Sequence, residues 1–501
     1  MRKYLGKFLL SGVSFAIFSS MQFAYADNGF ANEKTDVLFE IKQSNKASVE
    51  ILDKVNTIND FKEGLLALRV EVSTAEDTAA TETKAQGVIN SIAAPNFNAT
   101  IDKNGTGFYI ITTVEGLAEI IKSENVLSVN SAISKIQSSS SNSSSSYVYA
   151  PDAAKPAKDY TGKGITVAVI DSGVNTNHPQ IKGKIVKEYC FLSPDTSALT
   201  ATQLKIKLSK FGKDYGGCPN GKNFDESIGA SEDENGHGSN VTGIIAAQPS
   251  TTKDAVPRGS APGVNIVSMK VTNAKGRSQT QDIVSALRKL ATDPALNDVK
   301  VINLSITNPG NIPEDCDNMS KGDYQGLINQ LVSQGKTFVA GSGNNGYSTG
   351  EGFPSCLSST ISVAAHSATT IPGKSSDFYN NYKCVHPNLN VTADEITCFS
   401  NVGPSTDIVA PGVNVNSIYK KNGSIVNTSA KMTGTSQATP AVSACVARML
   451  EKDPTLTPAA IKNYLQNSGK YITKPNDKDF YIPKMDCDAA IDMVNAMVKK
   501  A

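Results

Sequence analysis

One stretch restricts the fold of this 501-residue chain more than any other, a turn of small residues followed by an apolar helix. The turn comprises residues 434–440 (GTSQATP), and residues 441–450 are apolar on most faces of a helix. Such a helix has to be buried inside a domain. Ser436 is therefore expected at the start of a core helix, where unpaired backbone N–H groups and the helix dipole favour a developing negative charge. Taken alone, the turn is better explained as a closely packed helix start.

The rest of the C-terminal region alternates between strand and helix patterns. Residues 164–170 form a continuous apolar run, which is typical of a strand in a sheet covered on both faces. Further strand patterns lie at 264–271, 300–304, 337–340 and 360–364. Helical patterns lie at 279–291 and 324–334, and a last helix is expected after Thr457 as its N-cap. This order predicts an α/β domain over residues 152–501, with a mostly parallel sheet and helices on both faces.

Three residues supply the groups that acyl transfer requires. Asp171 directly follows the first strand pattern, His237 is one of only four histidines, and Ser436 starts the apolar helix. Each has a structural alternative when considered alone, such as an Asp-Ser-Gly turn for Asp171. Together they provide an orienting carboxylate, a base of near-neutral pKa and a nucleophile. They occur in the chain order Asp, His, Ser.

The residues that flank these three agree with one protein family. The motifs are DSGV from Asp171, His237-Gly238 with Val241 and Gly243, and Gly434-Thr435-Ser436 with Ala438-Thr439-Pro440. On these motifs, residues 152–501 resemble a subtilisin-like serine protease, which has the same chain order. The resemblance implies that Ser436 is the nucleophile and His237 the general base and then acid, with Asp171 orienting the imidazole. In the loop GSGNNG at 341–346, Asn344 takes the position of the oxyanion donor. Sedolisins, a related family, would instead carry a Glu base and an acidic oxyanion residue.

The resemblance also implies which residues contact the substrate. The stretch VINLS at 301–305 matches the strand that lines the family's substrate cleft. The predicted substrate-binding residues are Leu304, Ser305, Ile306, Thr307 and Gly343. Thr307 replaces a glycine that would let the substrate approach closely, so we expect a narrowed or reshaped pocket.

Three consecutive acidic residues, at 232–234, precede His237. A solvated acidic loop is the favoured interpretation. The alternative is a preference for basic residues near P2 of the substrate.

The N-terminus reads as an export signal. Basic residues precede an apolar run at 8–19, and the small residues at 24–26 suit signal-peptide cleavage, so residues 1–26 are expected to be a signal peptide too short for a membrane span. No second long apolar stretch follows, so we expect a protein without a membrane span, secreted or periplasmic. The net charge of +1 gives no reason to expect nucleic-acid binding.

Residues 27–136 predict a small α+β domain. Strands are expected at 37–41 and 107–111, and helices at 61–68 and 114–123. The family resemblance implies an inhibitory propeptide that the enzyme removes itself. A Ser-rich linker is expected at 137–151, because a tract of serines cannot bury apolar surface. Processing is expected between about Gln137 and Pro156.

All eight cysteines lie between Cys190 and Cys487, which in an exported protein favours disulfides. Spacing alone leaves 105 pairings open. Pairing of neighbours predicts Cys190–Cys218, Cys316–Cys356, Cys384–Cys398 and Cys445–Cys487. A zinc site is the rival, although the chain has no CxxC motif. We expect no cofactor for catalysis. Calcium is common in the family, and residues such as Asp225 or Asp315 could serve as ligands, but no site is assigned because no contiguous ligand loop occurs.

The sequence thus predicts an exported, monomeric serine endopeptidase that acts on proteins or peptides and is made as an autoprocessed zymogen. Two alternatives stay open. One is a non-catalytic binding or adhesion protein that reuses the fold. The other is a narrow processing protease that matures one partner protein.

Overall fold

This computed structural model describes residues 40–42, 66–72, 78–93, 96–101, 107–112, 114–135 except 121, 124, 127 and 132, 139–141, 160–194, 216–252, 255–319, 322–370, 392–420, 428–474 and 477–498. The described residues all belong to one compact unit, Lys34–Ala501. The predicted signal peptide, residues 1–26, lies outside them, as does Cys384 of the predicted pair with Cys398.

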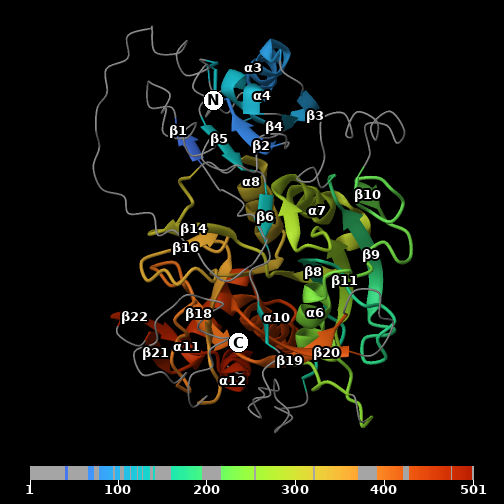
Figure 1. Ribbon diagram of the computed structural model, residues 1–501. Helices are drawn as coiled ribbons and strands as arrows, with labels where there is room; N and C mark the ends of the chain where they lie inside the picture. Colours follow the sequence, from blue (N-terminus) through green and yellow to red (C-terminus); the bar gives the residue numbers. More distant parts are fainter. Residues whose placement is uncertain are drawn as a thin grey trace. The chain divides into compact units, whose positions relative to one another are not determined.

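The centre of the C-terminal region is an eight-stranded sheet of order β10-β9-β11-β8-β13-β15-β17-β18 (Figure 1). Its strands are β8 (Thr166–Asp171), β9 (Ile185–Phe191), β10 (Phe224–Asp225), β11 (Asn265–Lys270), β13 (Val299–Leu304), β15 (Thr337–Gly341), β17 (Ile361–His366) and β18 (Ile408–Pro411). Every neighbouring pair is parallel except β9 and β10. The predicted mostly parallel sheet is confirmed, and each expected strand is present with its ends shifted by one or two residues.

Helices cover both faces of this sheet. They are α6 (His237–Ala246), α7 (Thr280–Thr292), α8 (Gly322–Ser333), α10 (Thr435–Lys452), α11 (Pro458–Ser468) and α12 (Cys487–Val498), with a short 3-10 helix η2 (Pro294–Leu296). Alternate residues of β8 face two different cores. Val167 and Val169 belong to the core with α6, α10, α11 and α12, whereas Ala168 and Ile170 belong to the core with α7 and α8. This alternation explains why the four inner residues of β8, 167–170, are all apolar.

Helices α10 and α11 form as the sequence predicts, but α11 is not the last helix, because α12 follows it along the chain. Residues 435–450 of α10 are all buried, which confirms the apolar core helix. In α11, the Thr457 side chain accepts a hydrogen bond from the backbone N–H of Ala460, which confirms the predicted N-cap.

In the N-terminal region, the described residues form an antiparallel five-stranded sheet of order β1-β5-β2-β4-β3 and two helices. Its elements are β1 (Glu40–Lys42), β2 (Leu66–Glu71), α3 (Thr78–Ser91), β3 (Asn96–Ile101), β4 (Gly107–Thr112), α4 (Val114–Ile120) and β5 (Ser128–Ser131). The predicted α+β unit is present. The helix predicted at 61–68 is wrong at its C-terminal end, because residues 66–68 lie in β2. Leu68 and Val70 are both buried, so the pattern there has the period of two of a strand.

Two short strands follow this region along the chain. β6 (Ile133–Lys135) pairs antiparallel with β12 (Arg277–Gln279), and β7 (Ser139–Ser141) pairs antiparallel with β20 (Thr428–Thr433). β7 lies within the predicted flexible linker, but its three serines form a strand at the edge of a sheet. An edge strand is held by main-chain hydrogen bonds, so it needs no apolar side chain. β20 also pairs with β19 (Val415–Tyr419). Two further antiparallel pairs are β14 (Asn308–Ile312) with β16 (Glu351–Phe353), and β21 (Tyr471–Lys474) with β22 (Asp477–Pro483).

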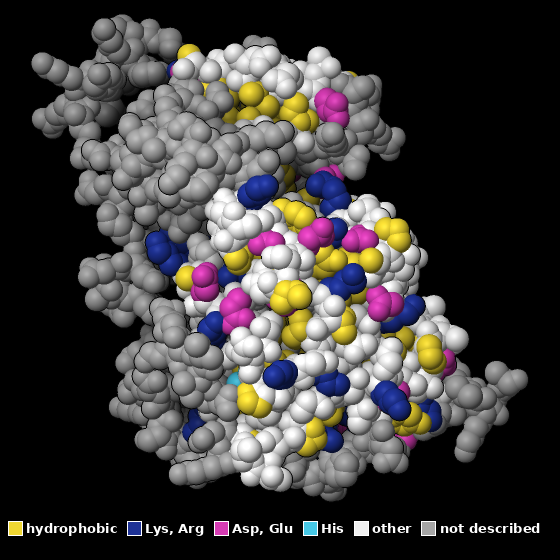
Figure 2. Space-filling view, turned by 90° about the vertical axis from the view of Figure 1, so that its right-hand side faces the viewer, with side chains coloured by type: hydrophobic (Ala, Val, Ile, Leu, Met, Phe, Trp, Pro, Cys, Tyr) yellow, Lys and Arg dark blue, Asp and Glu magenta, His cyan; other side chains and the backbone are white. Residues whose placement is uncertain are grey.

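Three of the predicted disulfides are confirmed. They join Cys190 to Cys218, Cys316 to Cys356, and Cys445 to Cys487. Within the described ranges, no helix is both long and apolar enough for a bilayer, and no three acidic, His or Cys side chains gather as a metal site would require. On the face shown in Figure 2, basic and acidic side chains of the described residues are interspersed.

Candidate active site

A buried carboxylate–imidazole pair lies at the carboxyl edge of the central sheet. Asp171 is the last residue of β8 and His237 is the first residue of α6. His237 Nδ1 lies 2.7 Å from Asp171 Oδ1, and both residues are fully buried. A carboxylate only accepts hydrogen bonds, so Nδ1 carries the proton. His237 Nε2 is then the basic nitrogen, and among the described residues it has no hydrogen-bond partner.

The backbone segments that carry Asp171 and His237 lie very close to each other. A Cβ atom built on Gly238 would lie 2.1 Å from the carbonyl oxygen of Gly173, far inside van der Waals contact. Gly236, which precedes the helix, has a φ of 99°, in the left-handed region that favours glycine. The glycines on both sides of His237 therefore let the start of α6 lie directly against the Asp171 turn.

The nucleophile candidate occupies the start of the neighbouring helix. Ser436 is the second residue of α10, and its Oγ donates to the carbonyl oxygen of Ser305 at 3.1 Å. Ser305 Oγ in turn donates to the carbonyl oxygen of Ser436 at 3.0 Å. Gln437 Nε2 donates to Asn240 Oδ1 at 3.3 Å, which ties the first turn of α10 to the first turn of α6. Ser436 and His237 thus begin two adjoining helices.

The register of the sheet brings these groups to one edge. Leu304 of β13 lies opposite Ile170 of β8, so Ser305 and Asp171 are the next residues on two adjacent parallel strands. β15, on the other side of β13, leads into the loop that carries Asn344. The structure therefore places all four predicted catalytic residues at the carboxyl ends of three neighbouring strands, as expected for an α/β fold.

The carboxamide of Asn344 is oriented by α10. Asn344 Oδ1 accepts a hydrogen bond of 2.8 Å from the backbone N–H of Thr435, and only 9% of the residue is exposed. This assignment directs Nδ2 to the opposite side of the carboxamide, away from the Thr435 N–H. The Asn344 carboxamide is therefore held by the residue that directly precedes Ser436.

The predicted substrate-binding residues have different environments. The side chains of Leu304 and Ile306 are buried in the core with α7 and α8, so only their main chain is available to a substrate. Ser305 contacts Ser436, as described above. Thr307 is half-buried; its Oγ1 donates to the carbonyl oxygen of Gly341 at 2.8 Å, and its Cγ2 would lie 2.3 Å from a Cβ built on Gly352. The remaining predicted residue, glycine at 343, has a φ of +110°.

The acidic stretch before His237 has a structural role at the start of α6 that the sequence did not reveal. Asp233 is fully buried, and its carboxylate accepts five hydrogen bonds: from the N–H groups of Asn235, Gly236 and Ser239, and from the hydroxyls of Ser172 and Ser239. It thereby caps the start of α6. Burial raises the pKa of Asp233, and these hydrogen bonds oppose that rise.

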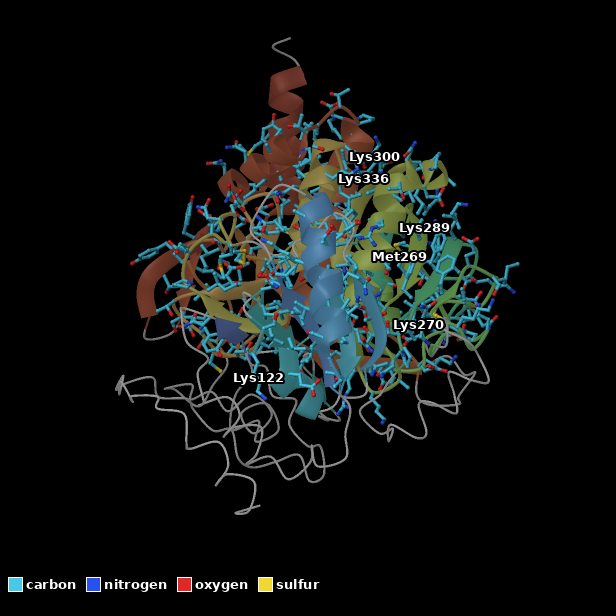
Figure 3. All side chains as sticks on the ribbon, turned by 90° about the horizontal axis from the view of Figure 1, so that it is seen from above. Lys122, Met269, Lys270, Lys289, Lys300 and Lys336 are labelled. Atoms are coloured by element: carbon cyan, nitrogen blue, oxygen red, sulfur yellow. A yellow bond between two sulfur atoms is a disulfide. The ribbon has the colours of Figure 1, made fainter. Side chains whose placement is uncertain are left out.

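The two flanking acids are paired as well. Glu232 forms an ion pair with Lys420, and Glu234 forms one with Lys270, whose position at the end of β11 is labelled in Figure 3. The solvated-loop interpretation is therefore wrong for Asp233. The hypothesis of a basic P2 preference is weakened, because all three carboxylates already have partners within the protein.

Comparison with known proteins agrees with this geometry. Residues 162–481 match the model of the subtilase family. The chain belongs to the subtilase family. It is 28% identical to Subtilisin BL of Lederbergia lenta over 316 residues, which are 63% of this chain and 87% of that protein. It is also 28% identical to the extracellular protease of Xanthomonas campestris over 326 residues, which are 63% of this chain and 49% of that protein.

A solved structure of a protease from Pseudoalteromonas arctica covers 67% of this chain and 91% of its own, with 21% identity and a TM-score of 0.49. As a subtilase, the chain is a serine-type peptidase, and its substrates are proteins.

Proposed function

We propose that this subtilase is an endopeptidase that cleaves proteins through an acyl-enzyme on Ser436. His237 Nε2 takes the Ser436 proton as Oγ bonds to the substrate carbonyl carbon, and the carbonyl oxygen becomes an oxyanion. Asn344 Nδ2 and the Ser436 N–H stabilise that charge. The C–N bond then breaks as His237 gives the proton to the leaving amine, and water repeats the sequence on the acyl-enzyme. Asp171 stabilises the imidazolium throughout.

The contact between Asp171 and His237 supports this proposal most directly. A buried carboxylate 2.7 Å from one ring nitrogen leaves the other as a base beside the helix that carries Ser436. Since Ser436 Oγ donates to Ser305 in this structure, the serine side chain has to rotate towards His237 before attack. Such contacts often form only when substrate binds.

Digestion of casein by the purified protein tests the activity. Wild-type protein is expected to release peptides throughout casein, and Ser436→Ala protein is expected to release none. A wild-type protein that cuts a single site would favour a narrow processing protease. A folded wild type without activity would favour the non-catalytic binder.

We further infer that the protein is exported and made as a zymogen that cleaves itself. The N-terminal signal pattern, the disulfides and the extracellular relative from Xanthomonas support export. Two strand pairings support self-cleavage. β6 ends at Lys135 beside β12, and β7 begins at Ser139 opposite Thr433, three residues before Ser436. Ser139 therefore lies on a strand that pairs with the strand leading to Ser436.

These pairings move the expected processing position to the N-terminal end of the range expected from the sequence and make it narrower. We propose that the processed bond lies between Lys135 and Ser139; residues 136–138 themselves lie outside the described residues. N-terminal sequencing of the active species should find a new terminus in this window, and Ser436→Ala protein should keep its full propeptide. A terminus beyond Ser139 would contradict the position, and a processed Ser436→Ala protein from a protease-deficient host would contradict self-cleavage.

The pocket beside Ser436 is proposed to prefer small substrate side chains. Thr307 bridges Gly341 and Gly352 where the family has glycine, so its methyl group takes up room there.

Catalysis by the triad is proposed to need no cofactor, so chelation by EDTA should leave the initial rate unchanged. A structural calcium ion would instead be detected as an EDTA-dependent fall in the midpoint of thermal unfolding.

A further inference from the structure

The loop that carries Asn344 has no regular secondary structure of its own. It leaves β15 at Gly341 and turns through Gly343, whose φ is +110°. Buried backbone groups in such a loop need hydrogen-bond partners from elsewhere in the protein. The question is therefore which residue supplies them.

One buried side chain is the partner of three main-chain groups in this loop. Asn401, in the segment before β18, is fully buried. Its Oδ1 accepts from the N–H groups of Asn345 at 2.9 Å and Tyr347 at 3.1 Å. Its Nδ2 donates to the carbonyl oxygen of Ser342 at 3.2 Å.

The main chain of Asn401 adds two more contacts. Its N–H donates to the carbonyl oxygen of Gly343 at 2.9 Å, and its carbonyl oxygen accepts from Ser342 Oγ at 2.8 Å. These contacts lie on both sides of Asn344 and none of them involves Asn344 itself. Asn401 therefore brackets the oxyanion donor without touching it.

The fit between Asn401 and this loop is close. A Cβ built on Gly343 would lie 2.4 Å from Asn401 Nδ2, so the loop can lie there only because residue 343 is glycine. The Asn344 side chain is held separately, through Thr435. The backbone of the donor thus depends on Asn401, while its carboxamide depends on α10.

We propose that Asn401 is a positioning residue that sets the location of the oxyanion donor Asn344. This inference rests on the proposed role of Asn344 in catalysis. Without the Asn401 carboxamide, the N–H groups of Asn345 and Tyr347 lose their acceptor and the Ser342 carbonyl oxygen keeps only the Gly352 N–H, so the loop shifts. Oxyanion stabilisation depends steeply on donor position, so a displacement of about 1 Å would cost as much as 100-fold in rate.

A double-mutant cycle between Asn401 and Asn344 tests the proposal. Asn401→Ala is expected to lower kcat at least tenfold, with KM changed less than about threefold, because substrate binding does not use the loop donor. In an Asn344→Ala background, the same Asn401 substitution is expected to change kcat less than about twofold. Asn401→Asp, which keeps the acceptor for Asn345 and Tyr347, is expected to retain more activity than Asn401→Ala.

Gln180 offers a matched control. It is also a buried carboxamide that holds main-chain groups of a loop, those of Gln248 and Val256, and it makes no contact with the loop of Asn344. Gln180→Ala is expected to lower the midpoint of thermal unfolding but to leave kcat per folded enzyme unchanged. Rates are therefore compared at a temperature where each variant is folded by circular dichroism.

The outcomes are separable. Equal losses in kcat from Asn401→Ala in both backgrounds, or an effect on KM alone, would overturn the positioning role while leaving the proposed function intact. An Asn344→Ala protein with wild-type kcat would overturn both, because the oxyanion role itself would be absent. If Asn401→Ala fails to fold, Asn401→Asp takes its place in the same cycle.

Discussion

Replacement of Asp233 should destabilise the protein strongly, although this residue has no part in the proposed chemistry. Its carboxylate accepts five hydrogen bonds in a fully buried site, three of them from backbone N–H groups at the start of α6. Each buried donor left without an acceptor costs about 1–3 kcal/mol. Since such costs are not additive and water enters part of the space, we expect Asp233→Ala to lower the free energy of unfolding by about 4 kcal/mol.

Asp233→Asn should be milder for a reason visible in the geometry. With its carbonyl oxygen in the place of Oδ1, the asparagine keeps the hydrogen bonds from Ser172, Asn235 and Gly236. Its amino group then faces the Ser239 N–H, which is the only backbone donor left without an acceptor. The expected loss is about 2 kcal/mol.

Chemical unfolding in a Ser436→Ala background, which prevents self-digestion, measures these differences. Glu234→Gln is the control, because it removes an acid one residue away whose side chain is 61% exposed, and it should cost less than about 1 kcal/mol. Asp233→Ala within 1 kcal/mol of the parent would refute this reasoning. So would equal losses for the alanine and asparagine variants.

Three further predictions concern other parts of the molecule. Gly238→Ala should separate His237 from Asp171, because its Cβ would lie 2.1 Å from the Gly173 carbonyl oxygen; a loss of at least tenfold in kcat is expected, and unchanged kinetics would contradict it. Asn344→Ala should lower kcat by about 100- to 1000-fold; this magnitude was obtained on a subtilisin and is carried over within the family rather than worked out from this structure. Burial raises the pKa of Glu351 from 4.5 to about 7, so the folded state holds a proton that the unfolded state has lost. The free energy of unfolding should therefore fall by about 3 kcal/mol as pH rises from 4.5 to 7. Urea titrations at several pH values should show that this fall is absent from Glu351→Gln protein.

The sequence predicted the parts of this protein whose signal is local. Residues 167–170 of β8 and residues 441–450 of α10 stand out because segments buried on every side are mostly apolar. Asp171, His237 and Ser436 were found because each sits in a short motif shaped by close backbone approach. The prediction that neighbouring cysteines pair was correct for three disulfides, because each of these joins two cysteines only 28 to 42 residues apart.

The sequence missed features that depend on which distant segments meet. Residues 66–68 were assigned to a helix because their short apolar run fits either period, and pairing with β4 and β5 decides for a strand. Asp233 reads as one of three surface acids until folding surrounds it with donors. Asn401 lies 57 positions after Asn344, and nothing in its own neighbourhood in the sequence marks it. A buried polar residue is recognisable only once its partners are known.

The central claim is that Asp171, His237 and Ser436 act as one catalytic unit, and covalent labelling tests it most directly. A fluorophosphonate should phosphonylate the processed enzyme once, on the peptide that contains Ser436, as located by mass spectrometry. The labelling rate should fall at least 100-fold in His237→Gln protein that retains its fold. Label on another serine, or a rate independent of His237, would contradict the account.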